Sequence, residues 1–283
     1  MVALAVASAG CSLLVSVDGL SSPQGPAPAS EAGADLESGA APDGAAASDG
    51  AAVDGAGDTA APPAPACDGG NDPDLVAYFP LDEIGGDAVH DCSGRGNNGK
   101  VISAPSGGAW GPGHAGGGFH GDGTSGCIDL GTPSDLSLES ESFTVAAWVN
   151  AHTFNDGALA RYIFGRTKAG VTAGYRLATG AGAAVLWTIY GSGPSTITST
   201  AGGLPVDTWM HVAITYSQGK GATVYVGGAS AATGPAPAIA PDGTATVRIG
   251  CRGDNSLYFD GVIDELRVYK RALSAADVQA LAQ

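Results

Sequence analysis

The sequence has few basic residues. Lys and Arg together number 12 against 28 Asp and Glu, which gives a formal net charge of −16 at pH 7 over 283 residues. Nucleic-acid binding needs a concentrated basic face that releases counterions from the phosphate backbone. The composition therefore argues against a nucleic acid as partner, whereas neutral glycans and divalent cations are compatible with an acidic chain.

Aromatic residues are absent from the N-terminal part. Residues 18–66 consist almost wholly of Ala, Gly, Pro, Ser and Asp, and they contain eight acids but no Lys or Arg. Such a segment cannot bury enough apolar surface to offset chain entropy. We therefore expect a disordered acidic tether over residues 12–66, with a root-mean-square span of about 40 Å. One folded domain is expected over residues 67–283.

No apolar run reaches the roughly 20 residues that a membrane-spanning helix needs. Residues 1–10 form a short apolar run that ends in small residues before Cys11, and no Lys or Arg precedes it. This pattern resembles a bacterial lipoprotein signal with its lipobox over residues 1–11. The resemblance implies lipidation of Cys11 and a lipid-anchored place in the bacterial cell envelope, at the outer membrane or cell surface. The alternative is an apolar N-terminus with an unpaired or buried Cys11.

Signatures of catalysis are also missing, because the chain has no G-x-S-x-G, H-E-x-x-H or phosphate-loop motif. A glycoside hydrolase needs two carboxylates that face one cleft. Asp264 and Glu265 are adjacent, so on a strand they would point to opposite faces. Glu139 and Glu141 are two residues apart, so on a strand they would point to the same face. They lie, however, in a turn-like Ser/Glu stretch. We therefore expect no catalytic residues.

Four cysteines remain within the predicted domain: Cys67, Cys92, Cys127 and Cys251. Their spacing lacks the paired C-x-x-C pattern of a zinc site, and an even number in an exported chain predicts two disulfides. Three pairings are possible, and spacing does not choose among them. The short loop between Cys92 and Cys127 weakly favours that pair, which would leave Cys67 to pair with Cys251.

From residue 75 onward, apolar residues alternate with polar ones between turns rich in Gly, Pro, Asp and Asn. This period of two predicts an all-β fold, most simply a two-sheet antiparallel jelly-roll sandwich with a short C-terminal helix. The predicted strands are residues 75–81, 127–130, 143–149, 162–164, 175–178, 184–190, 211–216, 223–226, 246–249 and 262–269.

Seven sequence landmarks follow one another in order across this region. They are LVAYFPLDE (75–83), DCSGRGNNG (91–99), FHGDG (119–123) with IDL (128–130), SFTVAAWV (142–149), TWMHVAITY (208–216), FDGVIDELRVY (259–269) and KRALSAADVQAL (270–281). Together they resemble the laminin-G-like domains of the concanavalin A-like lectin/glucanase superfamily. YVGG (225–228) departs from that pattern, which usually has an Asp before the turn glycine. The resemblance implies a concanavalin A-like sandwich.

A structural calcium ion is the cofactor that this resemblance implies. Strand alternation places Asp264 on the same face as Leu266, so its carboxylate must be paired or coordinated. Asp82, Asp91 and Asn97 should neighbour this strand if the resemblance holds, and oxygen ligands suit Ca²⁺. We therefore predict a calcium site of Asp82, Asp91, Asn97 and Asp264. The alternatives are a salt bridge to Arg252 or Arg267, or a carboxylate capped by loop N–H groups.

Two tryptophans and one histidine are further candidates. Trp148 and Trp209 could stack on sugars, although an aromatic residue within an apolar strand is more often part of the packing. His211 is predicted to be a structural histidine. Ser274, followed three residues later by Asp277, predicts a capped C-terminal helix.

The leading functional hypothesis is a non-catalytic, surface-tethered module that binds a carbohydrate or an extracellular protein. Its ligand-binding residues cannot be named from the sequence. A structural protein of the envelope or matrix that makes protein contacts only is the second hypothesis. A glycoside hydrolase is the third.

Overall fold

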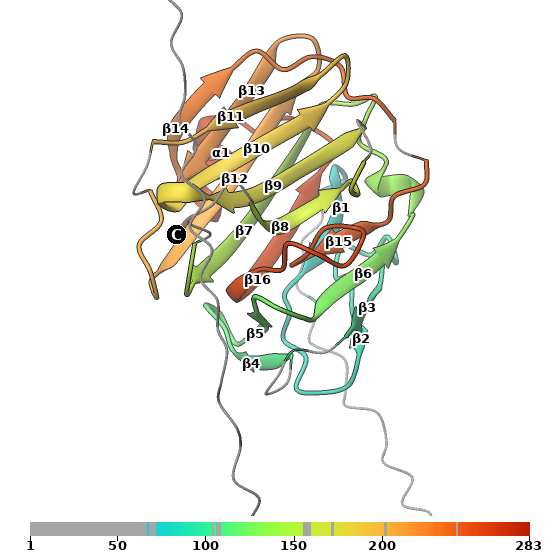
Figure 1. The fold of residues 1–283 in the computed structure, drawn as a ribbon, viewed down its shortest axis with the longest axis vertical. Helices are drawn as coiled ribbons and strands as arrows, with labels where there is room; N and C mark the ends of the chain where they lie inside the picture. Colours follow the sequence, from blue (N-terminus) through green and yellow to red (C-terminus); the bar gives the residue numbers. More distant parts are fainter. Residues whose placement is uncertain are drawn as a thin grey trace, which may run out of the picture. The chain divides into compact units, whose positions relative to one another are not determined.

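The structure is a computed structural model that describes residues 67, 72–103, 105, 109–154, 160–170, 173–200, 203–241 and 243–283. Cys11 and the segments predicted as signal and tether lie outside the described residues. The predicted all-β class is confirmed: two antiparallel sheets of eight strands face each other, with one short C-terminal helix (Figure 1).

Sheet A runs in the order β14-β13-β12-β7-β16-β5-β4, and β1 also pairs with β16. Its strands are β14 (Ala229–Gly234), β13 (Gly221–Val226), β12 (Trp209–Ser217), β7 (Phe143–Ala151), β16 (Asp260–Tyr269), β5 (Gly117–Asp122), β4 (Trp110–Pro112) and β1 (Leu75–Phe79). The sequence neighbours β12, β13 and β14 form hairpins, as do β4 and β5, and the remaining strands are joined by longer connections.

Sheet B runs in the order β11-β10-β9-β8-β15-β6-β3-β2. Its strands are β11 (Pro194–Thr198), β10 (Ala184–Tyr190), β9 (Gly174–Gly180), β8 (Arg161–Arg166), β15 (Val247–Ile249), β6 (Cys127–Gly131), β3 (Gly99–Ile102) and β2 (Ala88–Val89). All ten predicted strands are present, with ends shifted by a few residues. The strands not predicted are β2, β3, β4, β5, β11 and β14.

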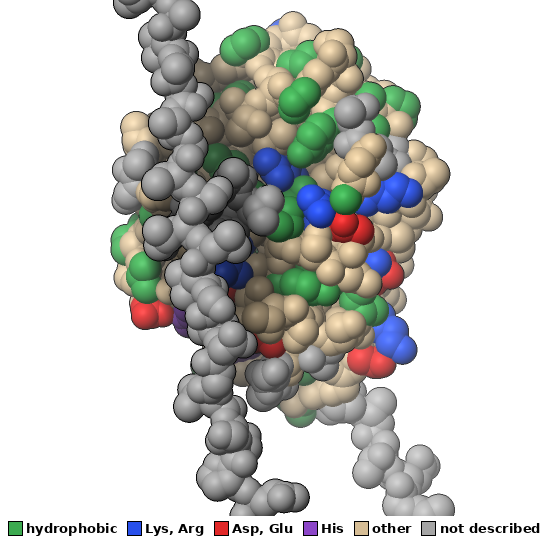
Figure 2. Space-filling view, viewed as in Figure 1, with side chains coloured by type: hydrophobic (Ala, Val, Ile, Leu, Met, Phe, Trp, Pro, Cys, Tyr) green, Lys and Arg blue, Asp and Glu red, His purple; other side chains and the backbone are tan. Residues whose placement is uncertain are grey.

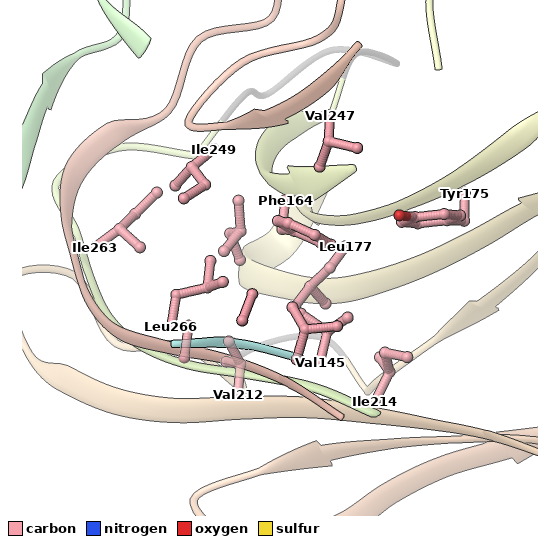
Figure 3. Close-up of a cluster of buried hydrophobic side chains, with 14 of the residues drawn as sticks. Val145, Phe164, Tyr175, Leu177, Val212, Ile214, Val247, Ile249, Ile263 and Leu266 are labelled. Carbon is pink, nitrogen blue, oxygen red and sulfur yellow. The ribbon is translucent and has the colours of Figure 1, made fainter. Parts of the chain in front are cut away.

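The core fills the space between the two sheets. Each strand turns alternate side chains inward, and these large apolar residues are fully buried. Figure 3 shows the labelled members from both sheets pointing toward one another: Val145, Phe164, Tyr175, Leu177, Val212, Ile214, Val247, Ile249, Ile263 and Leu266. Trp148 lies on the opposite face of β7 from Val145.

A β-bulge in β16 changes which residues share a face. The register with β7 shifts between Asp264 and Arg267, and Glu265 adopts a left-handed backbone with φ of 53°. Ile263 and Leu266 therefore both reach the core, whereas Asp264 lies on the outer face of sheet A, opposite Trp148. The prediction that Asp264 shares a face with Leu266 is wrong, because simple alternation assumed no bulge.

Two disulfides tie the domain together, and they use all four predicted cysteines. They join Cys67 with Cys92 and Cys127 with Cys251. The favoured pairing of Cys92 with Cys127 is therefore wrong. Strand order explains the observed pair, because β6 and β15 are neighbours in sheet B and bring Cys127 beside Cys251 across 124 residues of sequence.

The C-terminal helix α1 (Ala275–Leu281) forms as predicted. The Ser274 side chain accepts from the Asp277 backbone N–H, and the Asp277 side chain accepts from Ser274 in return. Val278 is fully buried in a small second apolar cluster that also contains Leu273, and Leu281 packs against it. Among the described residues, no helix has the length and apolar character needed to cross a membrane.

Candidate functional site

Residues 113–117 comprise the loop of the β4–β5 hairpin together with the first residue of β5, and two carboxylates hold this 113–117 loop in place. Asp264 accepts hydrogen bonds from the backbone N–H groups of His114 and Ala115, and Asp82 accepts one from Gly117. A Cβ at Gly117 would come within 2.9 Å of the Asp82 Cα. Glycine is thus needed for the loop to approach the segment that follows β1.

The Asp264 carboxylate is fully buried beneath this loop. Oδ2 accepts from His114 and Ala115 at 2.8 and 2.9 Å, and Oδ1 accepts from the Glu265 backbone N–H at 2.8 Å. Desolvation by burial, with a further contribution from Glu265, raises the pKa of Asp264 to about 7 despite these hydrogen bonds. Of the alternatives to a calcium ion at Asp264, capping by loop N–H groups is the one observed.

Asp91 and Asn97 meet in a different place, the turn that follows β2. Both oxygens of Asp91 are engaged: Oδ1 accepts from the N–H groups of Tyr78 and Ser93, and Oδ2 accepts from the Ser93 hydroxyl and the Asn97 N–H. The Asn97 amide donates to the Val76 carbonyl at 2.7 Å. This turn is a structural clasp in which both carboxylate oxygens of Asp91 already accept from the protein.

The four predicted calcium ligands therefore do not fit one coordination shell. Asp82 and Asp264 hold the 113–117 loop, whereas Asp91 and Asn97 hold the turn after β2. The described part of the chain contains no group of three or more His, Cys, Asp or Glu side chains arranged to bind a metal ion. The predicted shell is corrected on this point, and the calcium ion itself stays a prediction.

A groove of about 440 Å³ lies between the β4–β5 hairpin and the segment that follows β1. We call it the Trp110 groove, and its lining residues are Asp82, Glu83, Ile84, Trp110, Gly111, Pro112, Gly116 and Gly117. The Trp110 ring packs edge-on against the core residue Phe119, with ring centroids 5.9 Å apart, and remains partly exposed. Its indole N–H donates to the Gly86 carbonyl, which fixes the ring.

The two carboxylates in the Trp110 groove are only partly satisfied by the protein. Glu83 is 5% exposed, and its Oε1 accepts from the His90 backbone N–H at 2.8 Å. Its Oε2 is buried without a hydrogen-bond partner in the described structure. Asp82 uses Oδ1 for the Gly117 N–H, and no described residue bonds to Oδ2. A buried acceptor without a donor is costly, and a ligand hydroxyl would satisfy it.

The aromatic residues singled out in the sequence lie in a separate cluster on the outer face of sheet A. The His114 ring stacks on Trp148 with centroids 3.6 Å apart, so one face of this tryptophan is already covered. Trp209 meets His114 edge-on. His211 is buried against Trp148, and its Nδ1 has no described partner. Burial, with smaller contributions from Arg267 and His114, lowers the pKa of His211 to about 4.

The candidate catalytic carboxylates are held in separate ion pairs. Glu265 accepts from the Tyr78 hydroxyl and pairs with Arg267 at 2.6 Å. Glu139 is buried against Arg166 at 2.9 Å. Glu141 lies 3.7 Å from Lys270. These contacts give each of the three a structural partner.

Sequence reasoning missed Trp110 and Glu83 as site residues. Trp110 lies in a three-residue strand among glycines, where no alternation identifies a face. Glu83 is part of the LVAYFPLDE landmark, which indicates the fold but no site. The clue in the sequence is a tryptophan within a Gly/Pro-rich segment, because a large aromatic residue in a loop needs either a packing partner or a ligand.

The two facing antiparallel sheets define a jelly-roll sandwich domain. The chain belongs to the concanavalin A-like lectin/glucanases superfamily, whose laminin-G-like family model matches residues 122–279. No curated protein sequence matches this chain.

Solved structures with the same fold include domain 4 of an extracellular GH43 arabinanase from Geobacillus stearothermophilus, in complex with arabinotriose. It is 20% identical with a TM-score of 0.53, over 74% of this chain and 98% of that one. The binding domain of Paraclostridial mosquitocidal protein 1 is 16% identical with a TM-score of 0.58, over 74% of this chain and 52% of that one.

The binding domain of botulinum neurotoxin DC, in complex with rat synaptotagmin II, is 14% identical with a TM-score of 0.57, over 74% of this chain and 51% of that one. The chain thus spans about half the length of the two toxin binding domains. At these identities the likeness concerns the fold.

Proposed function

We propose that this protein is a non-catalytic binding module that recognises a neutral carbohydrate through the Trp110 groove. The observation that carries the proposal is the partly exposed Trp110 ring beside Glu83, whose buried Oε2 lacks a donor. An indole face packs against the apolar C–H face of a sugar ring, and carboxylate oxygens accept from its hydroxyls. A groove that offers both an aromatic ring and carboxylate oxygens therefore suits a saccharide.

The charge of the groove narrows the ligand class. Its lining includes two carboxylates, Asp82 and Glu83, and no Lys or Arg. An acidic ligand would be repelled at such a site, whereas a neutral sugar donates hydroxyl hydrogens to the unused oxygens. The arabinotriose bound to the arabinanase domain of the same fold makes neutral arabino-oligosaccharides a suitable first probe.

The experiment is isothermal titration calorimetry with a panel of neutral oligosaccharides that includes arabinotriose. Trp110→Ala should weaken binding of the best ligand at least tenfold, because the stacking surface is lost. Trp209→Ala is the matched control: it removes the same side chain from the separate His114 cluster and should leave the affinity within twofold.

Glu83→Gln refines this test. The amide keeps the side-chain shape but replaces one acceptor oxygen with a donor, so binding of the same sugar should weaken several-fold. Equal affinities for the wild type, Trp110→Ala and Glu83→Gln would overturn the groove assignment. If no neutral sugar binds and a protein ligand binds instead, the carbohydrate proposal fails as a whole.

The proposal also includes display at the cell envelope. Cys11 as a lipidation site, residues 12–66 as a tether and a domain over residues 67–283 would hold the groove clear of a membrane surface. Mass spectrometry of the protein from a membrane fraction should find Cys11 diacylated or triacylated. Cys11→Ser should release the protein from that fraction, and retention there would contradict the anchor.

A further inference from the structure

The outer face of sheet B carries a polar row that the proposed carbohydrate site does not use. Strand register places Arg176 of β9 directly opposite Thr188 of β10, and Thr188 opposite Thr196 of β11. Sequence neighbours such as Tyr175 and Ile189 point into the core, so the row lies on the outer face. In Figure 2, Lys and Arg side chains (blue) lie on this face, over the strands of sheet B.

Arg176 lacks the partners that the other arginines on the strands of sheet B have. Arg166 and Arg248 each pair with an acid, and Arg161 donates to two backbone carbonyls. No described carboxylate lies within ion-pair distance of Arg176, although the chain carries 28 acids. The charge of this guanidinium is therefore not neutralised by the described part of the chain.

The contacts of Arg176 leave most of its hydrogen-bonding capacity unused. Its guanidinium carbon lies 5.4 Å from the centroid of the Tyr162 ring, and one terminal nitrogen donates to the Tyr162 hydroxyl at 3.4 Å. Its Nε is buried and has no described hydrogen-bond partner. A guanidinium that is partly desolvated and unpaired is costly, and a planar oxyanion that accepts two N–H bonds would offset this cost.

The surroundings of Arg176 favour a saccharide as the carrier of that oxyanion. Thr188 is buried, and its hydroxyl lies 3.0 Å from that of the exposed Thr196, two strand spacings or about 10 Å from Arg176. On β8, Gly165 lies opposite Arg176 and carries no side chain, so the guanidinium contacts β8 through Tyr162. A cation and a fixed, exposed hydroxyl at this separation fit an extended chain that bears hydroxyls and a carboxylate.

We propose that the outer face of sheet B is a second binding surface, in which Arg176 holds the carboxylate of an acidic sugar residue. Thr196, oriented by Thr188, contacts the neighbouring sugar. The ligand class is an acidic polysaccharide. It differs from the neutral class proposed for the Trp110 groove, and the two surfaces are independent.

The test is calorimetric titration of the full chain with trigalacturonate and with its methyl ester, which keeps the rings but loses the charge. Trigalacturonate should bind, and the ester should bind at least tenfold more weakly. Arg176→Gln should reduce trigalacturonate affinity at least tenfold, and Arg176→Lys should recover only part of it, because a lysine cannot form the bidentate contact.

Two control variants show whether the loss of affinity is specific to Arg176. Lys220→Gln removes one positive charge at the turn between β12 and β13 and should leave the affinity for trigalacturonate unchanged. Trp110→Ala should also leave it unchanged, so that failure here is distinct from failure of the proposed groove. Melting temperatures of all variants establish that each is folded.

Several outcomes would overturn the proposal. They are equal binding of the acid and the ester, retention of affinity in Arg176→Gln, and no binding of trigalacturonate to the wild type. Competition by inorganic phosphate at the same concentration as trigalacturonate would show recognition of an oxyanion without the sugar, which also contradicts the assignment to a polysaccharide.

Discussion

The carboxylates near β1, β16 and the β4–β5 hairpin fall into two kinds. In the Asp91 turn and beneath the 113–117 loop, both oxygens of Asp91 and of Asp264 accept from protein donors. In the Trp110 groove, Glu83 keeps a buried oxygen without a partner, and Asp82 has one oxygen unused by described residues. We call a carboxylate closed when both of its oxygens accept from the protein, and open when one oxygen has no protein donor. Closed carboxylates fix the backbone, and open ones remain available to a ligand.

The largest expected loss of stability comes from removing a closed carboxylate. Asp91→Ala removes the acceptor of four hydrogen bonds, two of which come from the buried N–H groups of Tyr78 and Asn97. We expect the free energy of unfolding to fall by about 3 kcal/mol, measured by urea denaturation. Asp87→Ala, which breaks only an exposed pair with Lys100, is the control and should change stability by less than about 0.5 kcal/mol. A loss below about 1 kcal/mol for Asp91→Ala would refute the clasp.

The raised pKa of Asp264 predicts a pH dependence of stability. The folded protein keeps the Asp264 proton up to a pKa of about 7, whereas the unfolded chain loses it near pH 4. Between these values the native state binds more protons, so the stabilising contribution falls as pH rises, by at most about 1.4 kcal/mol per unit. Asp264→Asn should remove this contribution to the pH dependence of urea midpoints measured from pH 4 to 7.

His211 provides the opposing control for this measurement. Its pKa is lowered to about 4 in the folded state, so its stabilising contribution is lost as pH falls below 6.5. The two slopes oppose each other in the wild type. Asp264→Asn should therefore reveal stability that rises with pH, and His211→Gln stability that falls with pH. Parallel slopes in the two variants would show that the assignment of these groups is incorrect.

A smaller effect is expected when an open carboxylate is changed. Glu83→Gln removes a buried charge whose Oε2 has no donor, and it retains an acceptor for the His90 N–H. We expect the melting temperature to change little or to rise by a few degrees while sugar affinity falls. A fall in melting temperature comparable to that of Asp91→Ala would place Glu83 among the structural carboxylates.

The smallest expected effect is that of a chelator. The predicted ligands Asp91 and Asp264 already accept from protein donors, so adding EDTA should leave the melting temperature unchanged within about 1 °C. Inductively coupled plasma mass spectrometry of the same sample measures bound metal directly. Stoichiometric Ca²⁺ together with a drop of several degrees would establish a calcium site with a shell other than the one predicted.

The sequence predicted the interior of the sandwich well and its edges poorly. Alternation in β7 and β12 is regular, so residues such as Val145 and Ile214 were assignable to the core. The edge strands β4 and β14 are rich in Gly or Ala, so they show no alternation of large apolar and polar residues from which a strand could be predicted. The β16 bulge was also invisible, because a left-handed Glu265 has no signature in the residue types.

The candidate site was accessible from sequence only in part. Asp82 was recognised as a polar residue near the last strand, and the structure shows that its Oδ1 accepts from the Gly117 N–H. Pairing of Cys127 with Cys251 depends on strand order over 124 residues, and a bias toward short loops misleads there. Trp110 and Glu83 line the same groove because the β4–β5 hairpin packs beside the segment that follows β1. That packing belongs to the tertiary fold, and the local sequence pattern does not indicate it.

The most direct test of carbohydrate binding in the Trp110 groove uses the indole N–H signals of the four tryptophans in a ¹H–¹⁵N NMR titration with the best neutral sugar. Trp110 lines the open groove, Trp187 is buried in the core, and Trp148 and Trp209 lie in the His114 cluster. We predict that the Trp110 signal shifts and the other three stay in place. A shift of Trp148 or Trp209 with Trp110 unmoved would contradict the groove as the binding site.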